Sequence, residues 1–164
     1  MRKLNSILNS AFVETASKSG LTNQPVIEAV NRAESAIEAQ LISHIMRFDF
    51  IIGDQKRLQF SEAVEIAGTA PGRVFVFQQL WIGQFRPDFC FIRANKDGRA
   101  IGLVVEADGK DWHYSSEAQI VHDNLRLATF AKHRVFTMRF LGHEIWKNCE
   151  TVIGHVRDFF DGVR

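Results

Sequence analysis

The chain has 164 residues, a formal net charge of +1 and 46% hydrophobic residues, values typical of one globular domain. Because the net charge is close to zero, a nucleic-acid site would have to be a local basic patch. Its two cysteines, Cys90 and Cys149, form no CxxC pair, which argues against a disulfide framework, a zinc site and thiol catalysis. No run approaches the ~20 apolar residues of a membrane span, so we expect a cytoplasmic protein without a membrane partner.

Apolar residues at helical spacing predict a short helix over residues 3–18. We expect residues 1–24 to form a helical extension and residues 25–164 to form the main domain. Two roles remain open for the extension: dimerisation, which would make the protein a homodimer, and packing on the sheet.

A longer helix is predicted from Pro25, which suits a first turn, to Phe48. Its apolar arc includes Glu34 and has Glu38 at the margin. Each acid therefore either extends to water or points into an interior site. Residues 49–72 give a weak signal, with one helical turn at 61–67.

Strand signals follow at residues 74–77, 85–92 and 100–106, with Gly83 at the turn between the first two. The short spacing predicts an antiparallel meander. The third strand is apolar on both faces, so we expect it inside the sheet.

The last third of the chain predicts a helix from Ser115 or Ser116 to His133, a strand over residues 135–140 and a helix over residues 150–160. Together with the meander, these elements predict a mixed α/β sheet flanked by helices.

Two acids, Asp88 and Glu106, each end an apolar stretch, and the turn at residues 95–98 joins those stretches. Residue 97 lies midway between the two acids, so a hairpin closed there places their carboxylates opposite each other. Cross-strand Cβ atoms are only ~4.5–5.5 Å apart, and facing like charges destabilise a sheet. The pattern therefore predicts a cation between Asp88 and Glu106.

Mg²⁺ or Mn²⁺ suits such a site, because hard cations take carboxylate, carbonyl and water oxygens. Asp88, Glu106 and the backbone carbonyl of Ala107 are the predicted metal ligands. Glu38 could bind the metal or an outer water, and Asp108 shares the face of Glu106 in an extended strand.

Five sequence blocks in order resemble the PD-(D/E)XK nuclease superfamily. Within it, they resemble the bacterial very-short-patch-repair-endonuclease-like domains, which are largely of unknown function. The blocks are an acidic helix at 35–41, a glutamine, turn and R-x-D-F strand at 79–89, an E-x-D-G…H segment at 105–113, a D-x-x-R helix at 123–126 and a closing strand and turn at 139–148. They span residues 30–160.

The resemblance implies a restriction-endonuclease-like fold and a metal-dependent DNA endonuclease, with Glu38, Asp88, Glu106 and Asp108 near the metal. It also implies that Gln79 orients water or substrate, and that His113 transfers a proton or contacts phosphate. The superfamily usually has lysine two residues after the glutamate, where this chain has Asp108. Related domains tolerate this change, which leaves Lys110 or His113 as general base.

Three functions remain open at this stage. The leading hypothesis is cleavage of DNA with Mg²⁺ or Mn²⁺; the second is a catalytically silent module that binds nucleic acid or a protein; the third is hydrolysis of a small phosphate ester. Trp112 either stacks on a base or packs in the core, and Arg126 either contacts phosphate or pairs with Asp123. The predicted phosphate contacts are Lys110, Arg126, Lys132, Arg134, Arg139 and Lys147.

Overall fold

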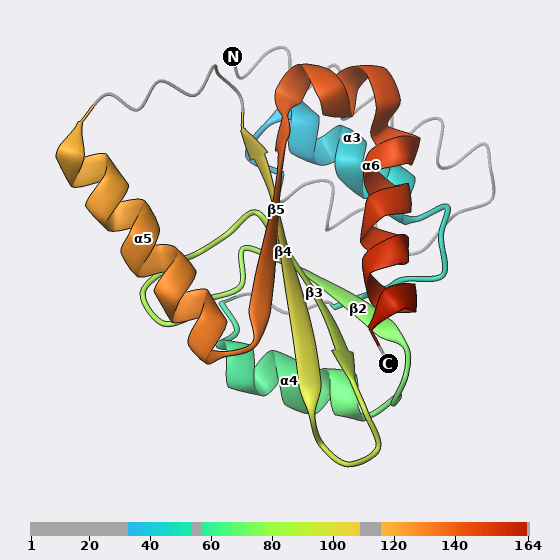
Figure 1. Cartoon of the computed structure of the whole chain (residues 1–164). Helices are drawn as coiled ribbons and strands as arrows, with labels where there is room; N and C mark the ends of the chain where they lie inside the picture. Colours follow the sequence, from blue (N-terminus) through green and yellow to red (C-terminus); the bar gives the residue numbers. More distant parts are fainter. Residues whose placement is uncertain (1–32, 54–56, 109–115, 164) are drawn as a thin grey trace.

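The computed structural model describes residues 33–53, 57–108 and 116–163 and has a mixed α/β architecture (Figure 1). In chain order the elements are α3 (Ala36–Ile45), β1 (Ile51–Ile52), α4 (Phe60–Gly68), β2 (Val74–Gln78), β3 (Phe89–Ala94), β4 (Ala100–Asp108), α5 (Glu117–Lys132), β5 (Val135–Leu141) and α6 (Gly142–Gly162). The five described strands form one sheet in the order β1-β2-β3-β4-β5. The strands β2, β3 and β4 are an antiparallel meander, while β1 and β5 pair with it in parallel.

Helices cover both faces of the sheet, and side chains of β4 point alternately to each. Leu103 and Val105 are fully buried in the core that α3 and α6 cover. Val104 is fully buried in the opposite core, beneath α4 and the Phe130 end of α5. The prediction that β4 is apolar on both faces and lies inside the sheet is therefore confirmed.

The β3–β4 hairpin has the predicted register. Phe89 pairs with Val105 and Ala94 pairs with Ala100, so the turn is centred on residue 97. In the turn, Asn95 N donates to Arg99 O at 2.7 Å, and Gly98 has a φ of 78°, a conformation that favours glycine. The turn signal and the apolar runs together specify this pairing.

The predicted helix from Pro25 to Phe48 is confirmed only in part within the described residues, because α3 begins at Ala36 and ends at Ile45. Ser35 is its N-cap, with an extended backbone and a side chain that accepts a hydrogen bond from Glu38 N. The cap also reverses the expected roles of the two acids. Glu34 lies outside the helix with a 60% exposed side chain, whereas Glu38 is buried.

Further differences from the prediction concern α6, the second meander strand and β1. The helix α6 spans Gly142–Gly162 instead of residues 150–160, because two helical segments join across a kink at Asn148. The second meander strand starts at Phe89, and the residues before it form a turn closed by a bridge between Ile82 and Phe85. The two-residue strand β1 was missed, since two residues are too few to show a period.

The predicted helix after Ser116 is confirmed as α5, with the Ser116 side chain accepting from Gln119 N. The predicted helix over residues 3–18 lies outside the described residues. Within the described part, no helix combines the length and apolar character needed to cross a membrane. Both thiols are buried, and burial raises the pKa of Cys90 and raises that of Cys149 to about 11, so neither is an activated nucleophile.

Candidate functional site

Asp88 and Glu106 lie at the same end of the β3–β4 hairpin, where β3 begins and β4 approaches its end. The pair Phe89–Val105 is the last of the β3–β4 ladder on this side, and Asp88 and Glu106 are the next residues outward. Backbone hydrogen bonds fix Asp88 there: Ala107 N donates to its Oδ2 at 3.0 Å, and Gln79 N donates to its main-chain oxygen at 3.0 Å. The structure thus brings together four of the residues singled out in the sequence.

The nearest cations to Glu106 in the described residues are two arginines. Arg126 Nη1 of α5 donates to Glu106 Oε1 at 2.7 Å, and Arg139 Nε of β5 donates to Glu106 Oε2 at 2.9 Å. Arg139 is the cross-strand partner of Glu106 in the β4–β5 ladder. The cation predicted from the sequence was a metal ion, and the pairing of Glu106 with these guanidinium groups was not predicted, because the parallel pairing with β5 cannot be read from hairpin spacing.

Asp123 completes a network of four charged side chains. Its Oδ1 lies 3.6 Å from Arg126 Nη2, the expected helical pair, and 3.6 Å from Arg139 Nη2. Two acids and two arginines give this network no formal net charge. Arg126 Nε and Nη2 are buried and have no hydrogen-bond acceptor among the described residues. These donors would be satisfied by an additional oxygen ligand.

Glu38 extends the acidic cluster from the α3 side. Its Oε1 accepts from Ser35 Oγ at 3.0 Å and its Oε2 accepts from Glu34 N at 3.0 Å, so its carboxylate binds the residues at the start of α3. Burial, followed by smaller contributions from the charges of Asp88 and Glu34, raises the pKa of Glu38 against the lowering effect of those hydrogen bonds. Its carboxylate therefore has a structural role in the cap and also senses the charge of Asp88.

Gln79 links the site to a surface ion pair. Its Oε1 accepts from Arg86 Nη1 at 3.2 Å, and Arg86 Nη2 donates to Glu34 Oε1 at 3.1 Å. Gln79 also has a φ of 52°, an uncommon conformation for a residue with a side chain. This backbone geometry allows Gln79 N to donate to Asp88 O.

Several predicted site residues lie outside the described part of the chain, namely Lys110, Trp112 and His113, together with the side chain of Asp108. The part that the structure describes contains no group of three or more His, Cys, Asp or Glu side chains arranged to hold a metal ion.

Comparisons of the chain with protein-family models, with curated proteins and with solved structures gave no significant match. The resemblance to the PD-(D/E)XK superfamily therefore remains a prediction from the five sequence blocks, and what the chain does must be argued from its site.

Proposed function

We propose that the chain is a metal-dependent hydrolase that cleaves DNA phosphodiester bonds at the Asp88–Glu106 site. The observation that carries the proposal is the position of both acids at one end of the β3–β4 ladder, with the buried Glu38 close enough to Asp88 for the charge of Asp88 to raise its pKa. Acids in such proximity repel one another, and a bound divalent cation relieves that repulsion.

The donor set fits Mg²⁺ or Mn²⁺, with Asp88, Glu106 and the Ala107 carbonyl as its protein ligands. All are hard oxygen donors, and such cations are commonly held by one or two carboxylates plus water and phosphate. When bound, the metal would lower the pKa of a water molecule and stabilise charge on a phosphoryl oxygen.

The two arginines on Glu106 are compatible with this role. A carboxylate has about four lone-pair sites, and the hydrogen bonds from Arg126 and Arg139 use two of them. Outer hydrogen bonds of this kind commonly orient a ligating carboxylate. The arginines would thus fix the Glu106 rotamer.

Other residues would position the substrate. Arg126 would contact a phosphate oxygen through the buried N–H groups that lack an acceptor among the described residues. Arg139 would assist, and Gln79 would orient water or substrate from its position beside Asp88. Asp108, Lys110, Trp112 and His113 keep their predicted roles next to the metal and on the nucleic acid.

A second function is favoured by the same ion pairs. Both Glu106 oxygens accept guanidinium hydrogen bonds, and the four-residue network is already neutral. A chain with this arrangement could bind nucleic acid or a protein partner without cleaving it, since a fold does not guarantee chemistry.

Plasmid nicking separates the two functions. We expect cleavage with Mg²⁺ or Mn²⁺, none with EDTA, and a loss on the order of 100-fold in Asp88→Asn, the usual effect of removing one positioned catalytic group. Asp158→Asn, an exposed acid on α6, is the matched control and should cleave like the unmodified chain. DNA binding in EDTA without cleavage of duplex, single-stranded or mismatched DNA would favour the silent module.

A further inference from the structure

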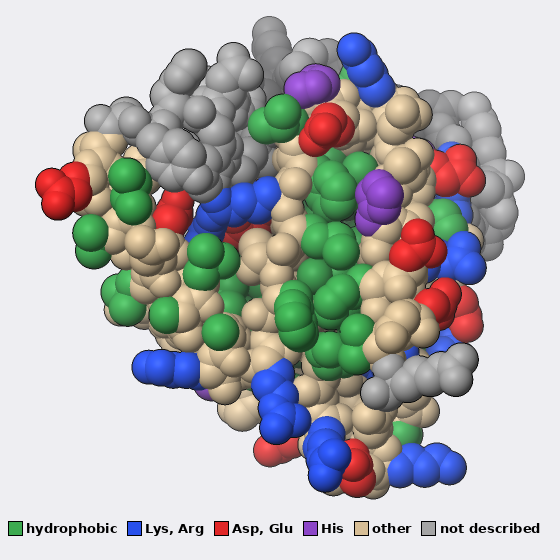
Figure 2. Space-filling view, in the orientation of Figure 1, with side chains coloured by type: hydrophobic (Ala, Val, Ile, Leu, Met, Phe, Trp, Pro, Cys, Tyr) green, Lys and Arg blue, Asp and Glu red, His purple; other side chains and the backbone are tan. Residues whose placement is uncertain are grey.

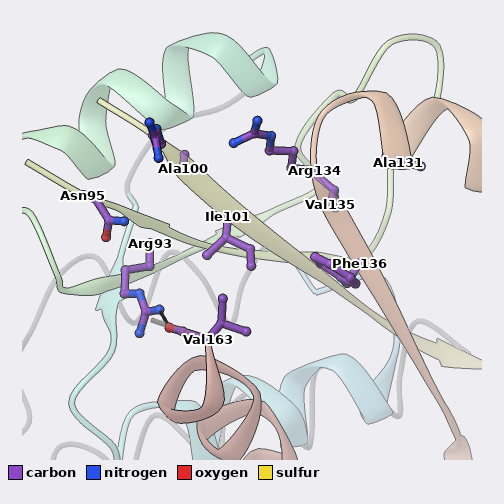
Figure 3. A pocket seen from close by; sticks show the side chains of 10 residues that line it. Arg93, Asn95, Ala100, Ile101, Ala131, Arg134, Val135, Phe136 and Val163 are labelled. Atoms are coloured by element: carbon purple, nitrogen blue, oxygen red, sulfur yellow. Dashed lines mark hydrogen bonds between the residues drawn. The ribbon is translucent and has the colours of Figure 1, made fainter. Parts of the chain in front are cut away.

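A basic pocket of about 520 Å³ lies at the other end of β4, where the β3–β4 turn, the start of β5 and the end of α6 meet (Figure 3). Ile101 lies in its wall, five residues along β4 from Glu106. At ~3.3 Å per residue, these two positions are roughly 17 Å apart. The pocket is therefore separate from the acidic site.

The wall of the pocket is strongly positive. Three of its ten lining residues are arginines, Arg93, Arg99 and Arg134, and none is acidic. Arg99 has one acidic neighbour, Asp97, at 3.4 Å, but both side chains are more than half exposed. Such exposed pairs contribute little, so Arg99 can exchange this partner for another anion.

Arg93 is held in place on one side of the pocket. It donates to the main-chain oxygens of Phe160 and Val163 at the end of α6, and its guanidinium lies 5.6 Å from the centre of the Phe160 ring. A guanidinium has five N–H donors, and each of these two bonds uses one. Arg93 therefore presents a pre-positioned charge with donors remaining.

Arg134 approaches the pocket from the opposite side (Figure 3). It follows the α5 C-cap with a φ of 56°, and its N donates to Ala131 O at 3.0 Å. Glycine usually occupies this left-handed position after a helix, because side chains disfavour the conformation. Position 134 thus carries a long cationic side chain although glycine would adopt this backbone conformation with less strain.

An aromatic ring lies beside these charges. Phe136 lines the pocket and is 53% exposed, and its outer neighbour Phe159 lies 5.3 Å away between ring centres. In the space-filling view, a hydrophobic band between β5 and α6 reaches down to several Lys and Arg side chains (Figure 2). Cationic donors next to an accessible ring match a ligand that carries both phosphate and an aromatic base.

We propose that this pocket binds a nucleotide unit, with its phosphate on Arg93, Arg99 and Arg134 and its base against Phe136. The volume lies within the ~300–1,000 Å³ of ordinary ligand sites. The unit could be a free nucleotide or part of a nucleic-acid strand, since both present the same chemistry. The inference does not depend on cleavage at Asp88 and Glu106.

The test titrates the full chain, in EDTA, with deoxyadenosine monophosphate by calorimetry and with a short fluorescent single-stranded oligodeoxynucleotide by anisotropy. At least one probe should bind, and Arg134→Gly should weaken that binding by about tenfold or more, as expected for loss of a charge-assisted contact. Because glycine suits the backbone there, the melting temperature of Arg134→Gly should not fall. Phe136→Ala should weaken binding of the nucleotide more than binding of inorganic phosphate.

Two controls isolate the pocket. Lys96→Gln removes an exposed charge three residues from Arg99 but outside the pocket lining, and should bind like the unmodified chain. Asp88→Asn should lose cleavage yet keep this binding, so failure of the nuclease proposal leaves the pocket proposal standing. Binding of the mononucleotide would identify a small-molecule site, and binding of the oligonucleotide alone a strand site. Absence of binding by either probe, or equal binding by Arg134→Gly, would overturn the inference.

Discussion

The two ends of β4 handle charge in opposite ways. Near Glu106 the charges are mostly buried and matched: the Glu106, Arg126 and Arg139 side chains are 8%, 16% and 23% exposed. Near Ala100 the arginines line a pocket without an acid in its wall, and Arg99 is 75% exposed. Buried charges must be compensated by the fold, whereas exposed ones remain available to a ligand. The ion pairs near Glu106 thus help to hold the sheet together, whereas the arginines near Ala100 remain available to a ligand.

Glu106→Gln should have the largest effect on stability. It removes the charge that neutralises Arg126 and Arg139, and breaking a buried ion pair from one side costs about 3 kcal/mol or more. Urea unfolding followed by circular dichroism would measure the loss in free energy of unfolding. The exposed Glu150→Gln on α6 is the control and should stay within about 0.5 kcal/mol of the unmodified chain. A Glu106→Gln variant as stable as this control would show that the network is not structural.

A smaller loss in free energy of unfolding is expected when one arginine is replaced, and this loss should differ between the two ends of β4. Arg139→Gln removes a charged hydrogen-bond donor to Glu106 and should cost about 1.5–2 kcal/mol. Arg99→Gln removes an exposed pair with Asp97 and should cost less than about 0.5 kcal/mol. The same unfolding assay tests both. Equal costs would remove the distinction between the two ends.

The smallest expected effect is the pH dependence contributed by Glu38. Its folded pKa is raised above the ordinary value of 4.5, so the folded state binds more protons than the unfolded state between these values. The free energy of unfolding should therefore fall as pH rises from 4.5 through the folded pKa. Glu38→Gln keeps an oxygen acceptor for the cap but does not titrate, so its free energy of unfolding should not show this decrease. Unfolding series of both chains across that range give the measurement, and parallel curves would contradict it.

Local patterns predicted much of the fold. Apolar strand runs and turn residues give the β2–β4 meander and the register of its β3–β4 hairpin, and the Ser116 cap gives the start of α5. The prediction was wrong where distant contacts or local caps override periodicity. The helix α3 starts at Ala36 because Ser35 and Glu38 cap it, although the helical spacing of apolar residues in the sequence begins before Ser35. The strand β1 exists only through its pairing with Phe75 and Val76.

The same division holds for the candidate site. The sequence by itself determined that Asp88 and Glu106 lie at the same end of the β3–β4 hairpin, because a short turn fixes which residues pair. Tertiary structure alone decided what compensates Glu106, since Arg126 and Arg139 reach it through α5 docking and a parallel strand pair. It also decided that Arg93 and Arg134, 41 positions apart in the chain, line one pocket. The spacing of neighbouring residues determines which residues pair within a hairpin. Contacts between residues far apart in the sequence depend on how the helices and strands pack.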